Sequence, residues 1–98
     1  MNELFIVVGL KAKEGKEQEL RRDLTAVVEP SRSEDGNLRY ELFVDQGDPR
    51  LFVFVEHWAS AEARQKHHTT APHILHFHAN GVRNVEQTEF AHMLSRIA

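Results

Sequence analysis

The fold is decided by residues 38–58, which read LRYELFVDQGDPRLFVFVEHW. Apolar and polar side chains alternate over residues 38–45, and residues 50–58 form a second run of strand-forming residues. Between the two runs, residues 46–49 contain Gly, Asp and Pro, which favour turns. The stretch therefore predicts an antiparallel β-hairpin.

The second strand of this hairpin sorts its side chains onto two faces. Successive strand residues point to opposite sides, so one face carries Phe52, Phe54, Glu56 and Trp58 and the other carries Leu51, Val53, Val55 and His57. If the aromatic face is buried, its carboxylate must be paired or neutralised. Glu56 is therefore expected to have either a structural partner or a catalytic task.

The residues before the hairpin predict a strand and a helix. Residues 4–10 are almost continuously apolar, as in a central strand that is covered on both faces. Residues 16–29 place apolar side chains at positions 20, 24, 27 and 28, which form one stripe on a charged helix. Pro30 is expected to end this helix, and Asp35-Gly36 predicts a turn in which glycine adopts a positive φ angle.

The residues after the hairpin predict an interrupted helix and a last strand. Ser60 suits the N-cap of a helix over residues 61–68. Pro72 interrupts the helical pattern but suits the first turn of a further helix, which is expected to run to Asn80 and to end at Gly81. Residues 82–90 have a weak strand pattern, and residues 91–98 are expected to form a terminal helical turn or a tail.

These elements follow the order β-α-β-β-α-β of the ferredoxin-like α+β fold, and residues 1–98 are expected to form a single domain. In this fold both helices cover one face of a four-stranded antiparallel sheet. The opposite face would expose a large apolar patch, which soluble monomers seldom tolerate. We therefore expect a homodimer that packs two sheets face to face, with a pocket between the sheet and the helices or between the subunits.

The composition excludes several classes of partner. Twelve Lys and Arg residues stand against 15 Asp and Glu residues, and the net charge of −3 without a basic stripe argues against nucleic acid. No apolar run approaches the roughly 18 residues of a membrane span. The N-terminal residues do not resemble a signal peptide, so we expect a cytoplasmic protein with no membrane partner. The chain has no cysteine, which excludes disulfides, thiol nucleophiles and cysteine-bound metals.

Two segments carry a family resemblance. Residues 36–42 read GNLRYEL, and residues 56–60 read EHWAS and are followed by Ala63, His67, Thr69, Pro72, His73 and Phe77. Together with the first strand and helix, these segments resemble the antibiotic biosynthesis monooxygenase (ABM) family, particularly its quinol monooxygenase branch. The resemblance implies a dimeric α/β barrel. It also implies a cofactor-independent monooxygenase that oxygenates a quinol, a polyphenol or a related small aromatic substrate with O₂ and needs no metal or flavin.

The chemistry of that reaction suggests a role for a histidine. A deprotonated, electron-rich phenol can pass an electron to O₂, so the protein needs only a base and a dry pocket. His67 occupies the position of the family's recurrent histidine, and its ordinary pKa of about 6.5 suits a base. Its alternative role is a structural hydrogen bond at the helix break. Glu56 is the second expected catalytic residue, because a neighbouring carboxylate would orient the ring of His67.

Four further residues are expected to bind the substrate. Trp58 and Phe54 are expected to form aromatic walls, and the Tyr40 hydroxyl is expected to contact either a substrate oxygen or Glu56. His73 belongs to the pattern that carries the resemblance and is also assigned to the substrate. For Trp58, the alternative is an ordinary place in the core.

The sequence departs from several branches of the family. Anthrone-oxidising members have an Asn and a Tyr where this chain has Phe54 and Arg64, and haem-degrading members have a first-strand Asn, so neither reaction is expected. An isomerase branch that acts on a small phosphorylated dicarbonyl signal compound shares part of both segments and is an alternative. It requires an anion site, for which Arg32, Arg39 and Arg64 are candidates. A non-catalytic small-molecule-binding dimer is a third hypothesis.

The seven histidines raise the question of a metal site. His73 and His76 are i, i+3 neighbours on the expected helix over residues 72–80, with His78 close behind. Helical two-histidine sites usually have i, i+4 spacing and a third ligand from elsewhere, and no HExxH motif or carboxylate pattern accompanies these residues. We interpret them as a solvent-exposed helix face and expect no metal.

Overall fold

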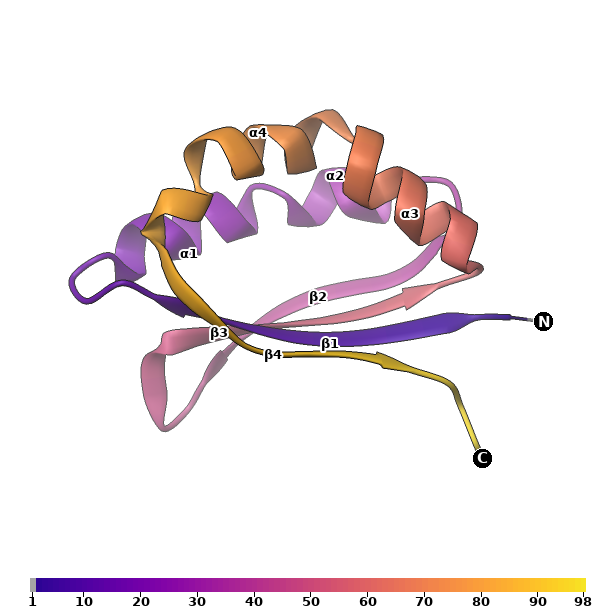
Figure 1. Cartoon of the computed structure of the whole chain (residues 1–98), viewed down its shortest axis with the longest axis horizontal. Coiled ribbons are helices and arrows are strands. Elements are labelled where there is room, and N and C mark those ends of the chain that lie inside the picture. The colour runs from indigo at the N-terminus through magenta and orange to yellow at the C-terminus, as the bar shows by residue number, and fades with distance from the viewer. Residues whose placement is uncertain (1) are drawn as a thin grey trace.

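The computed structural model describes residues 2–98, which form a four-stranded antiparallel sheet with the α-helices on one face (Figure 1). The strands lie in the order β2-β3-β1-β4, so β1 is central as predicted, although the helices cover only one of its faces and not both. The elements are β1 (Leu4–Ala12), α1 (Glu17–Thr25), α2 (Val28–Arg32), β2 (Asn37–Asp45), β3 (Asp48–Trp58), α3 (Ala61–Thr70), α4 (Pro72–Asn80), η1 (Val82–Asn84) and β4 (Val85–Leu94). This arrangement confirms the ferredoxin-like α+β fold. Within residues 2–98, no helix has both the length and the apolar character needed to cross a membrane.

The β2–β3 hairpin forms as predicted and sets the register of the covered face. Tyr40 pairs with Glu56, and Leu42 pairs with Phe54. Paired residues share a face of the sheet. On β3, that face buries Phe52, Phe54, Glu56 and Trp58, while the alternate residues are only partly buried. The core therefore lies between this face and the helices.

The first helical segment differs from the prediction. α1 ends at Thr25 and α2 begins at Val28, so Pro30 lies inside a helix and does not end one. Pro30 is the third residue of α2. The amide groups of a helix's first turn have no partner within the helix, so proline at this position removes no hydrogen bond. The predicted apolar stripe is nevertheless buried; it consists of Leu20, Leu24, Val27 and Val28.

The second helical segment follows the prediction, and the end of the chain does not. The Ser60 hydroxyl accepts a hydrogen bond from the Ala63 amide at 3.1 Å and caps α3, and Pro72 begins α4. Residues 82–84 form η1, however, and β4 continues to Leu94, beyond the predicted end at residue 90. The extra residues pair with β1, which would otherwise present an unpaired edge.

The face of the sheet opposite the helices is uncovered (Figure 1). The strand register arranges it in three rows across the sheet: Phe43-Val53-Gly9-Phe90, Glu41-Val55-Val7-His92 and Arg39-His57-Phe5-Leu94. The Phe90 ring lies over Gly9, where an added Cβ would be 2.6 Å from the ring. Phe43 is 47% exposed and Leu94 is 45% exposed. The uncovered face therefore carries an apolar patch that is bordered by charged residues on β2.

Candidate functional site

A cavity of about 150 Å³ lies between the helices and the covered face of the sheet. Its lining includes four of the predicted site residues: Tyr40, Phe54, Glu56 and His67. The remaining walls are aliphatic or aromatic, except for three polar residues of α3 and α4: Arg64, His68 and His78. The cavity is thus mostly apolar with a few polar groups, as is typical of small-molecule sites.

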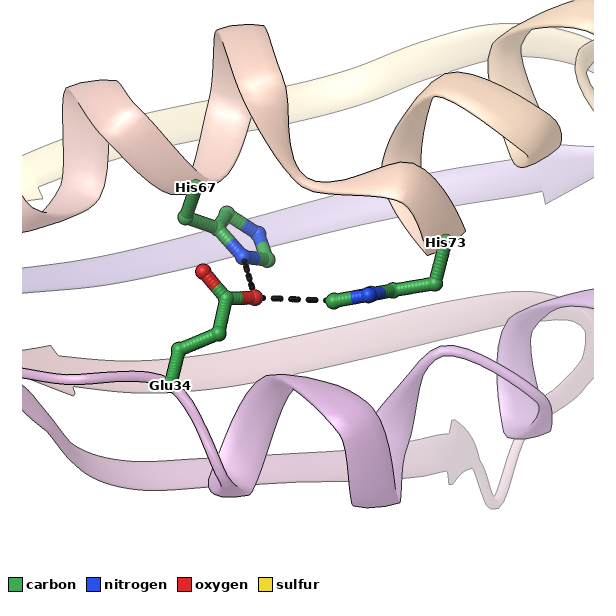
Figure 2. A group of neighbouring side chains, drawn as sticks. All are labelled: Glu34, His67 and His73. Carbon is green, nitrogen blue, oxygen red and sulfur yellow. Dashed lines mark hydrogen bonds and ion pairs between the residues drawn. The ribbon is translucent and has the colours of Figure 1, made fainter.

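One residue of the cavity lining, His67, forms a hydrogen-bonded pair with Glu34, which Figure 2 shows. His67 belongs to α3, its side chain is only 5% exposed, and its Nδ1 is 2.7 Å from Oε2 of Glu34. Glu34 lies between α2 and β2 and does not line the cavity, whereas His67 does. Glu34 therefore occupies the Nδ1 edge of the ring and leaves the Nε2 edge without a contact to this carboxylate.

A close contact between the Glu34 loop and α3 positions this pair. Gly36 adopts a φ angle of 84°, and a Cβ added there would lie 2.6 Å from the Cβ of Ala63. Glu34 precedes Gly36 by two residues, and His67 follows Ala63 by one helical turn. The predicted Asp35-Gly36 turn therefore sets the distance between the carboxylate and the imidazole.

The surroundings of His67 favour a neutral ring. Burial lowers the pKa of His67 below its ordinary value, and the hydrogen bond and charge of Glu34 act in the opposite direction without reversing the shift. A neutral imidazole next to a carboxylate donates its N–H to it, so we assign the proton to Nδ1. Nε2 is then an acceptor, which is the state that a general base requires.

Glu56 lies on the predicted face but has a different partner. Its Oε1 accepts a hydrogen bond from Nε1 of Trp58 at 2.9 Å. The prediction that Glu56 orients His67 is wrong, because the carboxylate in contact with the imidazole is Glu34. Burial raises the pKa of Glu56, while the hydrogen bond from Trp58 and the charge of Arg64 lower it. Glu56 is therefore a buried wall group that resists ionisation.

Tyr40 and Phe54 form an aromatic wall of the cavity. Their ring centroids are 5.2 Å apart, and the Tyr40 ring lies 5.5 Å from that of His67. Burial, together with the nearby charge of Glu56, raises the pKa of Tyr40 well above its ordinary value, and a hydrogen bond with Ser31 opposes this shift. The hydroxyl therefore stays protonated and can act as a donor.

Two of the predicted substrate-binding residues do not line the cavity. Trp58 is completely buried and packs against His67, with ring centroids 4.7 Å apart. His73, on α4, lies on the other side of Glu34 (Figure 2). Its Nε2 is 2.8 Å from Oε2 of Glu34 and 3.1 Å from the Ser31 hydroxyl. Trp58 therefore supports the ring of His67, and His73 belongs to the Glu34 cluster.

The sequence does not indicate Glu34 as a site residue, and it indicates Arg64 only as a candidate for the anion site of an isomerase. Glu34 gave no signal beyond its place before a turn, because 33 positions separate it from His67. Arg64 stood out as a departure from the family pattern and as a candidate for an anion site. Its Nε is buried, has no hydrogen-bond partner among residues 2–98, and belongs to a side chain that lines the cavity. An unpaired buried donor of this kind suits an oxygen atom of a ligand.

The histidines of α4 do not gather as a group. The side-chain amide of Asn80 lies 3.2 Å from Nδ1 of His76, and the His78 ring packs against His68. A different set does converge in the described part of the chain. Glu34, His67 and His73 each place one potential ligand atom within 4.8 Å of the others.

Comparisons with known proteins agree on a family. A family model described as "Antibiotic biosynthesis monooxygenase" matches residues 4–80. The chain is 36% identical over 72 residues to a Bacillus subtilis protein named "Putative monooxygenase YcnE", and the match covers 74% of this chain and 75% of that protein.

Solved structures share the fold over almost the whole chain. PA3566 from Pseudomonas aeruginosa has a TM-score of 0.93 at 32% sequence identity, covering 100% of this chain and 97% of that chain. Rv0793 from Mycobacterium tuberculosis has a TM-score of 0.89 at 22% identity, covering 99% and 97%. The second likeness supports the fold alone.

Proposed function

The chain belongs to the antibiotic biosynthesis monooxygenase family, and on that premise we propose that it oxygenates a single-ring quinol with O₂, without a bound cofactor. The observation that carries this proposal is the Glu34–His67 pair, which leaves Nε2 of His67 as an acceptor beside an aromatic cavity. Membership of the family supports oxygenation as the class of reaction, and the small aromatic cavity supports a single-ring quinol as the substrate.

In this proposal His67 is the general base. Its Nε2 takes the proton of a phenolic hydroxyl, and Glu34 stabilises the imidazolium that forms, as carboxylates do in other histidine-based sites. The Nε–H of Arg64 and the hydroxyl of Tyr40 donate hydrogen bonds to the quinol oxygens. The apolar walls exclude water, which strengthens these interactions.

The phenolate then reduces O₂. One-electron transfer gives a semiquinone radical and superoxide, which combine to form a C–O bond at a ring carbon, and the imidazolium returns its proton to the peroxide. His67, neutral again, removes the proton from that carbon as the O–O bond breaks, and it passes this proton to the departing hydroxide, which leaves as water. The product is a hydroxyquinone: one oxygen atom enters the ring, the other becomes water, and the quinol supplies all four electrons.

The volume of the cavity limits the size of the substrate. An apolar cavity of about 150 Å³ can hold a benzene-sized ring, whereas sites for drug-sized ligands usually exceed about 300 Å³. The cavity beside His67 has a volume of about 150 Å³. A quinol with one ring therefore fits better than a polycyclic anthrone or naphthoquinol.

The proposal includes a cytoplasmic homodimer that forms through the uncovered sheet face. A second copy would cover the three rows of that face and the adjoining groove of about 350 Å³ that residues 94–98 border. Light scattering should give twice the chain mass of 11.3 kDa. Val55→Lys, which places a charge in the central row, should give the monomer. A wild-type monomer in dilute solution would contradict the dimer.

The unpaired Nε of Arg64 also favours a second candidate, the isomerase of a small phosphorylated dicarbonyl compound. The other two candidate arginines are already paired, Arg32 with Glu29 and Arg39 with Glu41. One arginine makes a weak phosphate site, so we prefer the quinol. In the isomerase, His67 would move a proton between carbon atoms without consuming O₂.

Oxygen uptake with a panel of quinols separates these functions. With hydroquinone or methylhydroquinone, at about pH 7 with a chelator present, we expect one O₂ consumed per quinol and one oxygen atom from labelled O₂ in the product. A two-ring naphthoquinol should give a lower kcat/KM. Substrate binding without uptake above the uncatalysed rate would indicate the non-catalytic dimer. Solvent proton exchange into a phosphorylated dicarbonyl compound, without uptake, would indicate the isomerase.

A further inference from the structure

We propose that Glu34, His67 and His73 form a binding site for a divalent transition-metal ion of the zinc class. Their potential ligand atoms are Oε2 of Glu34, Nδ1 of His67 and Nε2 of His73, which lie within 4.8 Å of one another. The three side chains come from a loop, from α3 and from α4, and they point toward a common centre (Figure 2).

The present distances are those of hydrogen bonds, and a metal would lengthen them slightly. Both imidazole nitrogens contact the same carboxylate oxygen, at 2.7 and 2.8 Å. Zinc bonds of about 2.0–2.1 Å in a tetrahedral arrangement place neighbouring ligand atoms about 3.3 Å apart. Each contact with Glu34 therefore has to open by about 0.5 Å, and the two imidazole nitrogens, which lie within 4.8 Å of each other, have to reach the same spacing. A Glu side chain on a loop can make the first of these adjustments.

The cluster can also be reached from solvent. A groove of about 300 Å³ on the molecular surface is lined by Glu34 and His73, together with Asp35, Lys66 and Thr70. Structural zinc sites have four protein ligands, whereas sites with three protein ligands keep a fourth position for water. The groove supplies that water, and the Ser31 hydroxyl, 3.1 Å from Nε2 of His73, provides a nearby polar partner.

The donor set selects the class of ion. Two imidazole nitrogens and one carboxylate oxygen suit zinc, cobalt and similar ions, while magnesium and calcium prefer an all-oxygen set. The carboxylate of Glu34 adds one negative charge to two neutral ligands. Asp35 adds a second negative charge near the groove, and Lys66 opposes it.

The same ion would block the base, a consequence that rests on the proposed function. A metal on Nδ1 of His67 displaces the proton that now faces Glu34 and forces the proton of the neutral ring onto Nε2. Nε2 can then no longer accept a proton from a quinol. We infer that zinc inhibits the oxygenase reversibly.

Calorimetric titration of the chelator-treated protein with Zn²⁺ tests the site. Glu34→Gln and His73→Ala remove one ligand each. They should weaken binding by more than the roughly 10- to 100-fold that loss of an outer partner costs. His76→Ala removes an exposed histidine from the same helix and should leave the affinity within about twofold. Substitution with Co²⁺ should give the visible absorption of a four-coordinate nitrogen and oxygen site, and this absorption should be lost in His73→Ala.

The outcomes separate this inference from the proposed function. Equal zinc affinity in wild type, Glu34→Gln and His73→Ala, with their folding checked by thermal melting without metal, would overturn the site and leave the quinol proposal untouched. Binding that depends on Glu34 and His73 supports the site, whatever the enzyme does. Zinc that binds there without reducing oxygen uptake would remove His67 as the base.

Discussion

Each side of the sheet carries a histidine paired with a glutamate, and the two pairs differ in their surroundings. On the covered side, the His67 side chain is 5% exposed and that of Glu34 is 20% exposed. On the uncovered side, His57 is bonded to Glu3, and these side chains are 20% and 50% exposed. His57 lies flat against Phe5, with ring centroids 4.0 Å apart, beside an open groove.

The difference shows that a carboxylate–histidine contact does not by itself make a base. An exposed ion pair is worth about 0–1 kcal/mol and is screened by salt. In the Glu34–His67 pair, the imidazole is nearly buried, Glu34 holds its Nδ1 edge, and the ring lines a small, mostly apolar cavity. Both histidines contact a glutamate, so this contact does not distinguish them. His67 differs from His57 in its burial and in having Nε2 available as an acceptor.

The largest expected effect is on turnover when the two histidines are replaced in parallel. His67→Gln should lower kcat for quinol oxygenation by about 10²- to 10⁴-fold, which is the usual contribution of a general base. His57→Gln should change it by less than about threefold, because the side chain of His57 lies on the opposite face of the sheet and does not line the cavity. Steady-state oxygen uptake measures kcat for both variants. Equal losses would contradict the role of His67 as the base.

Replacing the two carboxylates should have a smaller effect. Glu34→Gln should lower kcat by about 10- to 100-fold, as loss of an orienting partner does at other sites, and Glu3→Gln should have almost no effect.

Activity needs neutral His67, so it falls as the pH drops through the pKa of His67. Glu34 raises that pKa, so Glu34→Gln should move this acid limb to lower pH in chelator-treated protein. An unmoved limb would mean that Glu34 does not act through His67.

Two glycines test whether the loop position matters for the buried pair. Gly36 and Gly15 have similar positive φ angles of 84° and 83°, but a Cβ at Gly36 meets Ala63, while a Cβ at Gly15 meets no atom within 4 Å. Gly36→Ala should cost about 2–3 kcal/mol and reduce turnover, and Gly15→Ala should cost about 1 kcal/mol without affecting turnover. Urea unfolding and oxygen uptake would show this. Equal effects of the two substitutions on turnover would mean that the position of the Gly36 loop does not affect the site.

The smallest expected effect concerns the buried carboxylate of Glu56. The pKa of Glu56 is raised in the folded protein, so its ionised form opposes folding, and the loss grows as the pH rises from about 4.5 through the folded pKa. Glu56→Gln keeps the acceptor for Trp58 and removes the ionisable group. The gain in stability of this variant over wild type should therefore be larger at pH 7 than at pH 4. Thermal melting at the two pH values measures this difference.

Much of the fold could be predicted from the sequence because its signals are local. The alternation in β3, the Ser60 cap and the Pro72 start each depend on neighbouring residues, and each is found in the structure. The prediction for Pro30 was wrong because the same residue can end a preceding helix or lie in the first turn of the next one. The sequence pattern does not distinguish these two cases. The length of β4 could not be predicted, because residues 91–94 are ordered by pairing with β1.

The site could be predicted only in part for a similar reason. His67 was found from the family resemblance, and Tyr40, Phe54 and Glu56 from the alternation of the paired strands. Glu34 is brought to His67 by the turn at Gly36, a contact between distant segments that no periodicity records. Such contacts have to be observed in the structure.

The position of β1 in the middle of the sheet has a consequence for biosynthesis. β1 is made before its partners β3 and β4, which follow about 45 and 80 residues later along the chain. At a synthesis rate of about 5–20 residues per second, the apolar segment of β1 waits roughly 4–16 s for its last partner. During that interval the nascent chain exposes an apolar strand without its partners, so holding chaperones should raise the yield of folded protein.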